Sequence, residues 1–161
     1  MNDTSNSPKA AVEAVLQTYG DMLYRLCLVL LKNTQDAEDA VQETLIKYYR
    51  KAPAFASREH EKAWLIRVAT NQCHDQLRFR SRHPVMEEMQ EGSLWESESS
   101  GILDALTAVP EKYRLVLTLY YVEAYPIKEI GKIIGRTPSA VKMRLQKGRK
   151  LLEEIYRKEY L

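Results

Sequence analysis

The chain contains 161 residues, of which 45% are hydrophobic and 29% are charged, and its formal net charge is +2. This length suits one ordinary domain or two small ones, and this hydrophobic content can bury a core, so a globular protein is expected. The charge is unevenly distributed. Residues 1–80 carry 11 Lys or Arg against 10 Asp or Glu, residues 81–110 carry 1 against 6, and residues 111–161 carry 12 against 6.

The first ten residues, MNDTSNSPKA, are polar and no apolar core follows them, which argues against a secretory signal. No apolar run approaches the ~18 residues of a membrane span. We therefore expect a cytoplasmic protein without membrane insertion. The two cysteines, Cys27 and Cys73, lie in apolar helical contexts, and we expect buried thiols rather than a disulfide or a metal site.

Helices are expected throughout, because apolar residues recur at spacings of three and four and alternating patterns are scarce. After a first apolar stripe that ends near Asn33, Thr34 is expected to cap a second helix over residues 35–51. Its inward positions are Ala37, Ala40, Val41, Leu45 and Tyr48. The outward side then presents Asp39, Gln42, Glu43 and Ile46. An acidic rim around an exposed apolar residue suits a protein partner, although most such faces are merely solvated.

A third helix is expected over residues 59–82, with a start signal at Ser57. Its inward positions are Leu65, Ile66, Ala69, Cys73 and Leu77. The opposite side carries Trp64, Arg67, Asn71, His74 and Arg78. Tryptophan beside arginine and asparagine suits unpaired bases, but Trp64 packed against the preceding loop as core is an equal alternative.

A flexible acidic linker is expected over residues 83–101, where Pro84, Gly92 and Gly101 interrupt the helical periodicity and Ser and Glu are abundant. It separates an N-terminal domain, residues 1–82, from a C-terminal domain, residues 102–161. The fold class is therefore all-α with two small helical domains.

The C-terminal domain contains a helix-turn-helix pattern. Its first helix, in IKEIGKIIG, turns Ile127, Ile130 and Ile134 inward. Gly135 and Arg136 supply the turn, and Thr137 caps a last helix that begins at Pro138. The inward face of this last helix consists of Val141, Leu145, Gly148, Leu152 and Ile155. Upstream, two short helices form a scaffold in which Tyr121 and Tyr125 are expected to pack in the core, with contact to DNA or to a partner as the less favoured alternative.

The helix-turn-helix segment is strongly basic. Residues 127–152 hold eight Lys or Arg and one acidic residue, Glu129, which leaves a net charge of +7. Such a charge attracts duplex DNA through counterion release, and the second helix of this motif enters the major groove. A solvated basic helix in an ordinary bundle would need neither the glycine turn nor the Thr-Pro start. We therefore expect DNA binding.

The sequence resembles the ECF (extracytoplasmic function) sigma factors of bacterial RNA polymerase over nearly its whole length. LYRLCLVLLKNTQDAEDAVQETLIKYYR and AWLIRVATNQCHDQLR resemble their region 2, and VPEKYRLVLTLYYVEAYPIKEIGKIIGRTPSAVKMRLQKGRKLL resembles their region 4. The resemblance implies a dissociable initiation subunit that binds core polymerase, recognises the −35 and −10 promoter elements and promotes melting. Family members are often held inactive by an anti-sigma factor.

The resemblance also implies site residues. The core polymerase-binding set is Asp39, Gln42, Glu43 and Ile46. The set that captures the melted −10 element is Trp64, Arg67, Asn71 and Asp75. The set that meets the −35 duplex is Ser139, Lys142, Met143, Gln146, Lys147 and Arg149. Relatives often carry an aromatic residue at Ile66, Asn at Asp75, Ser at Met143 and Ala at Gly148. Because Met143 donates no hydrogen bond, readout there is expected to be apolar.

The helix-turn-helix pattern is also compatible with two other classes of protein. A stand-alone helix-turn-helix regulator would bind a palindromic operator without polymerase. A nuclease or nucleotide hydrolase with a DNA-binding tail is disfavoured, because the sequence has no glycine-rich phosphate loop, no His and Cys cluster at ligand spacing, and only three scattered histidines. We therefore expect no enzymatic activity, no catalytic residues, no metal and no cofactor.

Overall fold

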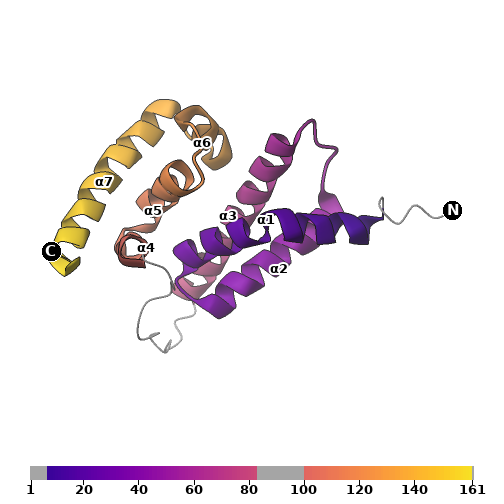
Figure 1. Cartoon of the computed structure of the whole chain (residues 1–161), viewed down its shortest axis with the longest axis horizontal. Coiled ribbons are helices and arrows are strands. Elements are labelled where there is room, and N and C mark those ends of the chain that lie inside the picture. Colours follow the sequence, from indigo (N-terminus) through magenta and orange to yellow (C-terminus); the bar gives the residue numbers. More distant parts are fainter. Residues whose placement is uncertain (1–6, 83–99, 161) are drawn as a thin grey trace. The chain divides into compact units, whose positions relative to one another are not determined.

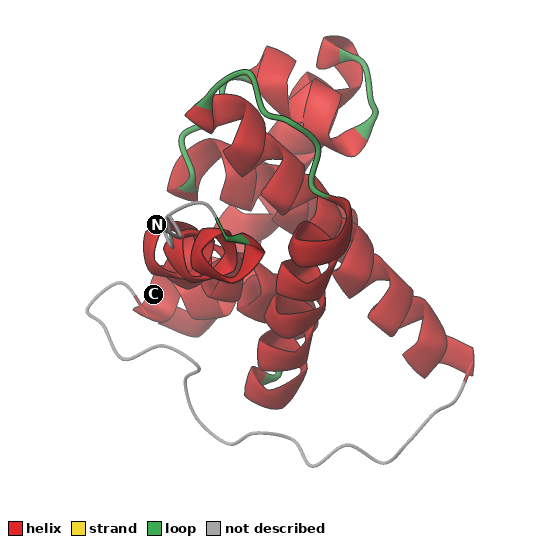
Figure 2. Cartoon of the chain, turned by 90° about the vertical axis from the view of Figure 1, so that its right-hand side faces the viewer, coloured by secondary structure: helices red, strands yellow, loops and turns green. Residues whose placement is uncertain are grey.

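The computed structural model describes residues 7–82 and 100–160, and the chain divides into two compact units, Met1–Val85 and Met86–Leu161. Every secondary-structure element in these two described ranges is a helix, which confirms the all-α prediction (Figures 1 and 2). The expected linker lies outside the described residues, except that positions 100 and 101 already belong to the first helix of the second unit. Each unit has a core of its own and is described by itself.

Three helices pack on one another in the first unit: α1 (Pro8–Leu31), α2 (Thr34–Lys51) and α3 (Arg58–Arg82) (Figure 1). The largest fully buried side chains of this unit come from α1 and α3, and they are Leu23, Leu26, Val29, Leu30, Leu65 and Ile66. Cys27 and Cys73 are buried in the same core, as expected. The inward face of α2 is made of small residues, including a buried Thr44 that sequence analysis did not place there.

Helix α1 is long and apolar enough to cross a membrane, which differs from the expectation that no run approaches that length. However, 56% of its most apolar window is buried within the structure. A core helix of a soluble protein meets the same criteria, and α1 supplies much of the core of its unit.

Side-chain caps set the starts of α2, α3 and α7. Asn33, not Thr34, caps α2, because its Oδ1 accepts a hydrogen bond from the backbone N–H of Asp36 at 3.0 Å. The expected cap at Ser57 is confirmed by its bond from the His60 N–H at 3.1 Å, and the cap at Thr137 by its bond from the Ala140 N–H at 3.2 Å. Asn33 wins over Thr34 because asparagine is among the strongest N-cap residues.

A hydrogen bond joins the end of α2 to the start of α3 across the intervening loop. The Tyr48 hydroxyl donates to Oε2 of Glu61 at 2.7 Å. Burial and this bond raise the pKa of Tyr48 to about 12 from its ordinary value of 10.0. The pair therefore holds the loop between the two helices as long as Tyr48 keeps its proton.

The second unit contains α4 (Ser100–Ala108), α5 (Glu111–Leu117), a π-helical stretch η2 (Thr118–Val122), α6 (Ile127–Ile134) and α7 (Pro138–Tyr160). Helix α7 packs against α4, α5 and α6. The core of the second unit contains Val109, Val116, Leu117, Leu119, Ile130 and Leu145. Of the three isoleucines expected inward from α6, only Ile130 is buried, and Ile133 joins it in place of Ile127 and Ile134, which are half-buried.

Arg114 ties α4 to α5 from inside the core. It is 4% exposed, and its Nη1 donates to the carbonyl oxygens of Thr107 and Val109, both at 3.0 Å. Burial lowers the pKa of Arg114, and the nearby Glu111 carboxylate opposes that shift. A buried charge is tolerated only with such acceptors, so Arg114 fixes the turn before α5.

The turn between α6 and α7 requires glycine at two positions. Gly135 has φ +70°, and the N–H groups of Gly135 and Arg136 both donate to the Gly131 carbonyl. At Gly131 a Cβ would lie 2.6 Å from the carbonyl oxygen of Arg136, which is a backbone atom that cannot rotate away. The glycines therefore bring the two helices of the motif close together.

Replacing Gly131 with Ala is expected to destabilise the second unit by about 1–3 kcal/mol, because the clash with the Arg136 carbonyl outweighs the better helix propensity of Ala. Gly135→Ala should cost about 1 kcal/mol, since its backbone is left-handed but no atom lies near. Native-state hydrogen exchange of the α6 and α7 amides checks both values. The first unit serves as internal control, and unchanged exchange in Gly131→Ala would contradict the clash.

Alkaline pH is expected to weaken the first unit through Tyr48. Because its folded-state pKa lies above the unfolded value, the stability it contributes is complete below about pH 10 and is lost as pH rises through about 12. The urea midpoint should therefore fall more steeply over this range in wild type than in Tyr48→Phe. Trp64 fluorescence in a Trp95→Phe background reports the unit, and Tyr49→Phe, at an exposed neighbour, should titrate like wild type.

Candidate functional site

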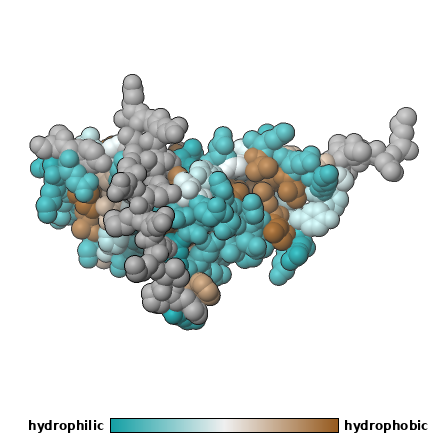
Figure 3. Space-filling view, turned by 90° about the horizontal axis from the view of Figure 1, so that it is seen from below, coloured by the Kyte–Doolittle hydropathy of each residue, from teal (hydrophilic) through white to brown (hydrophobic). Residues whose placement is uncertain are grey.

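The outward face of α2 is arranged as predicted. Asp39, Gln42 and Glu43 are exposed, and Ile46 is 39% exposed beside them. The opposite side of α2 is buried in the core and consists of Ala37, Ala40, Val41 and Thr44. Its packing fixes the orientation of the exposed face. In the view of Figure 3, hydrophilic residues cover most of the described surface and hydrophobic ones gather in separate patches.

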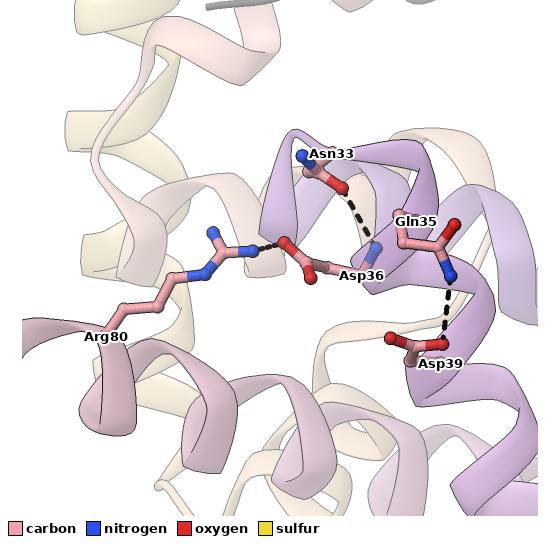
Figure 4. Close-up of polar contacts among 5 residues, drawn as sticks. All are labelled: Asn33, Gln35, Asp36, Asp39 and Arg80. Carbon is pink, nitrogen blue, oxygen red and sulfur yellow. Dashed lines mark hydrogen bonds and ion pairs between the residues drawn. The ribbon is translucent and has the colours of Figure 1, made fainter. Parts of the chain in front are cut away.

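An ion pair fixes the start of α2 against the end of α3. Arg80 of α3 pairs with Asp36 of α2 (Figure 4). Asp39, one turn further along, accepts a hydrogen bond from Nε2 of Gln35 at 3.3 Å instead. The charge of Asp36 is thus neutralised within the unit, whereas Asp39 keeps its charge on the exposed face.

The outward side of α3 carries three of the four residues predicted to capture the −10 element. Arg67, Asn71 and Asp75 are exposed and follow one another at four-residue spacing, so they form one stripe. Asp75 lies 3.8 Å from Nη2 of Arg78, and at this exposed position the pair adds little stability. The stripe therefore presents a cation, an amide and a carboxylate to solvent.

Trp64 is half-buried rather than standing free on this stripe. Its ring lies edge-on to those of Phe55 and Tyr48, with centroids 5.8 and 6.0 Å away. Phe55 also contacts His60 edge-on at 5.3 Å, and Nδ1 of His60 accepts a hydrogen bond from the Ala56 N–H at 3.2 Å. One side of the Trp64 ring is therefore packed against other aromatic rings, as in the core-packing alternative. These ring contacts also hold the loop before α3 in place.

One side-chain hydrogen bond joins α2 to α3 beside the two predicted binding sets. Nζ of Lys47 donates to Oε1 of Gln72 at 3.0 Å. Lys47 follows Ile46 in α2, and Gln72 follows Asn71 in α3. The structure therefore brings the two predicted sets of the first unit close together across this bond.

Helix α7 presents a reading face, which we define as Ser139, Lys142, Met143 and Gln146. All four are exposed, and Met143 is 71% exposed. The opposite side is anchored by Val141, Leu145 and Gly148, which are buried as predicted. Lys147 and Arg149 are also exposed, and they flank the buried Gly148 on its two sides.

Tyr121 is a contributor to this surface that sequence analysis placed wrongly. It is 54% exposed, not packed in the core, and its hydroxyl accepts a hydrogen bond from Nη1 of Arg149 at 2.9 Å. This bond raises the pKa of Arg149. The π-helical turn explains the error, because the added residue per turn rotates Tyr121 away from the position that α-helical spacing gives it.

No cluster of three His, Cys, Asp or Glu side chains that could hold a metal occurs within residues 7–82 and 100–160. The arrangement in these ranges consists of three exposed helix faces, on α2, α3 and α7, and the last of them is basic. Such faces bind macromolecules by complementary charge and shape.

Comparison with known proteins matches both units to one family. The family model of Sigma-70 region 2 matches residues 15–83, and that of Sigma-70 region 4 matches residues 100–152. The chain is 28% identical to the ECF RNA polymerase sigma factor SigW of Bacillus subtilis, over 89% of this chain and 87% of that protein. It is 27% identical to the RNA polymerase sigma factor SigV of the same organism, over 95% of each.

Solved structures share the fold. The sigma factor RpoE of Bartonella quintana, in complex with the anti-sigma factor NepR, matches with a TM-score of 0.75 and 22% identity, over 91% of this chain and 97% of that one. CnrH, in complex with the cytosolic domain of CnrY, matches with a TM-score of 0.71 and 20% identity, over 96% and 92%.

The alternative of a stand-alone helix-turn-helix regulator is wrong, because a sigma region 2 precedes the DNA-binding unit in the same chain. The two sigma regions follow one another in this chain, and relatives named as sigma factors match it over most of their length. The chain belongs to the ECF sigma factors, the family of RNA polymerase subunits that direct the start of transcription.

Proposed function

We propose that the first unit binds core RNA polymerase and unpaired promoter bases, while the second unit reads upstream duplex DNA. The observation that carries this division is the exposure of three functional faces on helices whose other sides are buried. The faces need no rearrangement of their own helix to meet a partner, which lowers the ordering cost of binding.

Polymerase binding is assigned to Asp39, Gln42, Glu43 and Ile46 on α2. Ile46 supplies an apolar contact, and the surrounding polar and acidic groups supply hydrogen-bond acceptors. A partner surface with arginines or lysines around an apolar centre would complement this face. Asp39 contributes because Gln35, not a cation, is its partner within the unit.

Capture of the −10 element is assigned to Trp64, Arg67, Asn71 and Asp75. The stripe on α3 offers donors and an acceptor for base edges, and the half-buried Trp64 offers the exposed part of its ring for stacking. Melting would draw on binding energy, since bases held by protein offset the loss of stacking and pairing.

Reading of the −35 element is assigned to the reading face of α7, with Lys147 and Arg149 on phosphates. Lys142 and Gln146 can donate to base edges, and the exposed thioether of Met143 suits a thymine methyl group. Arg149 is held by Tyr121 and reaches the border of this face as a preoriented cation.

The remaining assignments follow from this role. Catalysis belongs to the polymerase, so the chain itself is not an enzyme and needs no cofactor. Its place is the cytoplasm, where promoter DNA lies. An anti-sigma factor is proposed as a further partner. Two proteins of this fold were solved in complexes, RpoE with the anti-sigma factor NepR and CnrH with the cytosolic domain of CnrY.

Gel filtration of the full chain with bacterial core polymerase, followed by sequencing of transcripts started by the complex, tests the proposal. We expect a stoichiometric complex that initiates at new sites and thereby reveals both promoter elements. Tight binding to duplex DNA without association with polymerase would overturn the proposal.

Changing Gln42 and Glu43 together to Ala is expected to weaken polymerase binding about fivefold or more, because interface truncations that matter cost more than about 1 kcal/mol. Binding of the full chain to duplex DNA should not change. Glu13→Ala with Gln17→Ala removes the same groups from an exposed face of α1 and serves as the matched control. Equal losses of polymerase and DNA binding would contradict the division of labour.

Replacing Lys142 or Gln146 with Ala is expected to relax the preference at one base pair of the upstream element by about 1–3 kcal/mol. The measurement is the affinity of the polymerase complex for promoter fragments that differ at single upstream positions. A loss that is uniform over all sequences would identify phosphate contacts instead.

A further inference from the structure

Two lysines from different helices converge on one tyrosine at the border of the reading face. Nζ of Lys112, on α5, lies 5.0 Å from the centroid of the Tyr113 ring, and Nζ of Lys147, on α7, lies 5.9 Å from it. Both lysines are exposed, whereas Tyr113 is 7% exposed. We call these three residues the lysine–tyrosine site.

The close approach of α5 and α7 fixes this site. A Cβ at Gly148 would lie 3.1 Å from Cβ of Tyr113 and 3.1 Å from Cδ1 of Leu117. Helix α7 therefore packs closely on α5 at this glycine, and an added Cβ would require its neighbours to shift by a few tenths of an ångström. Because Lys147 precedes Gly148, its stem is held beside the Tyr113 ring, and Lys112 reaches the same ring from α5.

The positive charge of the site is not neutralised by the described parts of the two units. No ion pair within residues 7–82 and 100–160 involves Lys112 or Lys147. Burial alone would raise the pKa of Tyr113, but hydrogen bonding from the two lysines lowers it below its ordinary value. Both observations describe a positive potential that an anion would relieve.

We propose that the lysine–tyrosine site binds one phosphate of the DNA backbone beside the base pairs read by α7. The inference rests on the proposed function of α7 and adds to it a contact from α5, outside the helix-turn-helix. Lys147 follows Gln146 of the reading face, so an anion held there lies at the edge of the groove, where the backbone runs. Two ammonium groups suit the two free oxygens of a phosphodiester.

A polyanion is favoured over free phosphate because both lysines are exposed. Exposed cations gain most of their affinity from the release of counterions condensed along DNA, and a small ion in solution offers no such release. Tyr113 acts as a positioning residue that keeps the two ammonium groups together.

The first test is the binding of the full chain to a labelled duplex of random sequence between about 0.1 and 1 M KCl. For Lys112→Gln the slope of log affinity against log salt should fall by about 0.9, so its affinity deficit should be about eightfold at 0.1 M relative to 1 M. Lys158→Gln removes the same charge from the last turn of α7 and should change the slope less. Equal slopes for the two variants would overturn the site.

The second test locates the contact on promoter DNA bound by the polymerase complex. Single phosphates beside the upstream element are replaced with neutral methylphosphonates. Wild type should lose affinity at one such position, and Lys112→Gln should show no further loss there. Inorganic phosphate that displaced the duplex from wild type but not from Lys112→Gln, at constant ionic strength, would indicate a free-phosphate site and overturn the DNA assignment.

These outcomes separate the site from the proposed function. If the chain fails to start transcription with polymerase while Lys112→Gln still lowers the slope on random duplex, the proposed function fails and the site stands. If transcription starts but Lys112→Gln behaves like Lys158→Gln, the site fails and the proposed function stands.

Discussion

The contact between α5 and α7 at Gly148 is the constraint on which the DNA-binding surface depends. Because Cβ of Tyr113 and the side chain of Leu117 lie 3.1 Å from where a Cβ at 148 would stand, α7 packs closely on α5 at this point. Lys147 and Arg149 then emerge on the two sides of the contact, each beside a tyrosine from α5 or η2. Core packing thus sets the spacing of cations that face solvent, and glycine's lower helix propensity, up to about 1 kcal/mol, is the cost.

In the first unit, polar contacts between helices position the exposed residues. Small inward residues on α2 let that helix lie close to its neighbours, but they bury little apolar area. The Arg80 to Asp36 ion pair and the Tyr48 to Glu61 hydrogen bond hold its two ends against α3. These contacts lie at the borders of the α2 and α3 faces, so the bonds that align the helices also position the candidate binding residues.

Sequence periodicity predicted most of this arrangement because amphipathic helices repeat over many residues. The outward sets on α2, α3 and α7 follow directly from inward neighbours such as Ala40, Ala69 and Leu145. Tyr121 was misplaced because a π-helical turn changes the period locally, and Trp64 was ambiguous because its environment depends on a loop residue, Phe55. Lys112 gave no signal, because what singles it out is Lys147 of another helix near the same Tyr113 ring, and a contact between helices leaves no periodic trace.

Exposed residues of α7 and the buried residues that position this helix are expected to respond differently to substitution. A residue of the reading face, such as Met143, is largely exposed, so its replacement is expected to have a small effect on folding and, if the proposed function holds, to act on recognition. Gly131, Arg114 and Gly148 instead lie against backbone or core atoms of their own unit. A change at these positions is expected to shift the cations on α7 together, and so to alter affinity for DNA more than the choice among bases. In the proposed function, specificity is therefore carried by exposed residues of α7, whereas affinity also depends on buried residues of α5, α6 and α7 that position them.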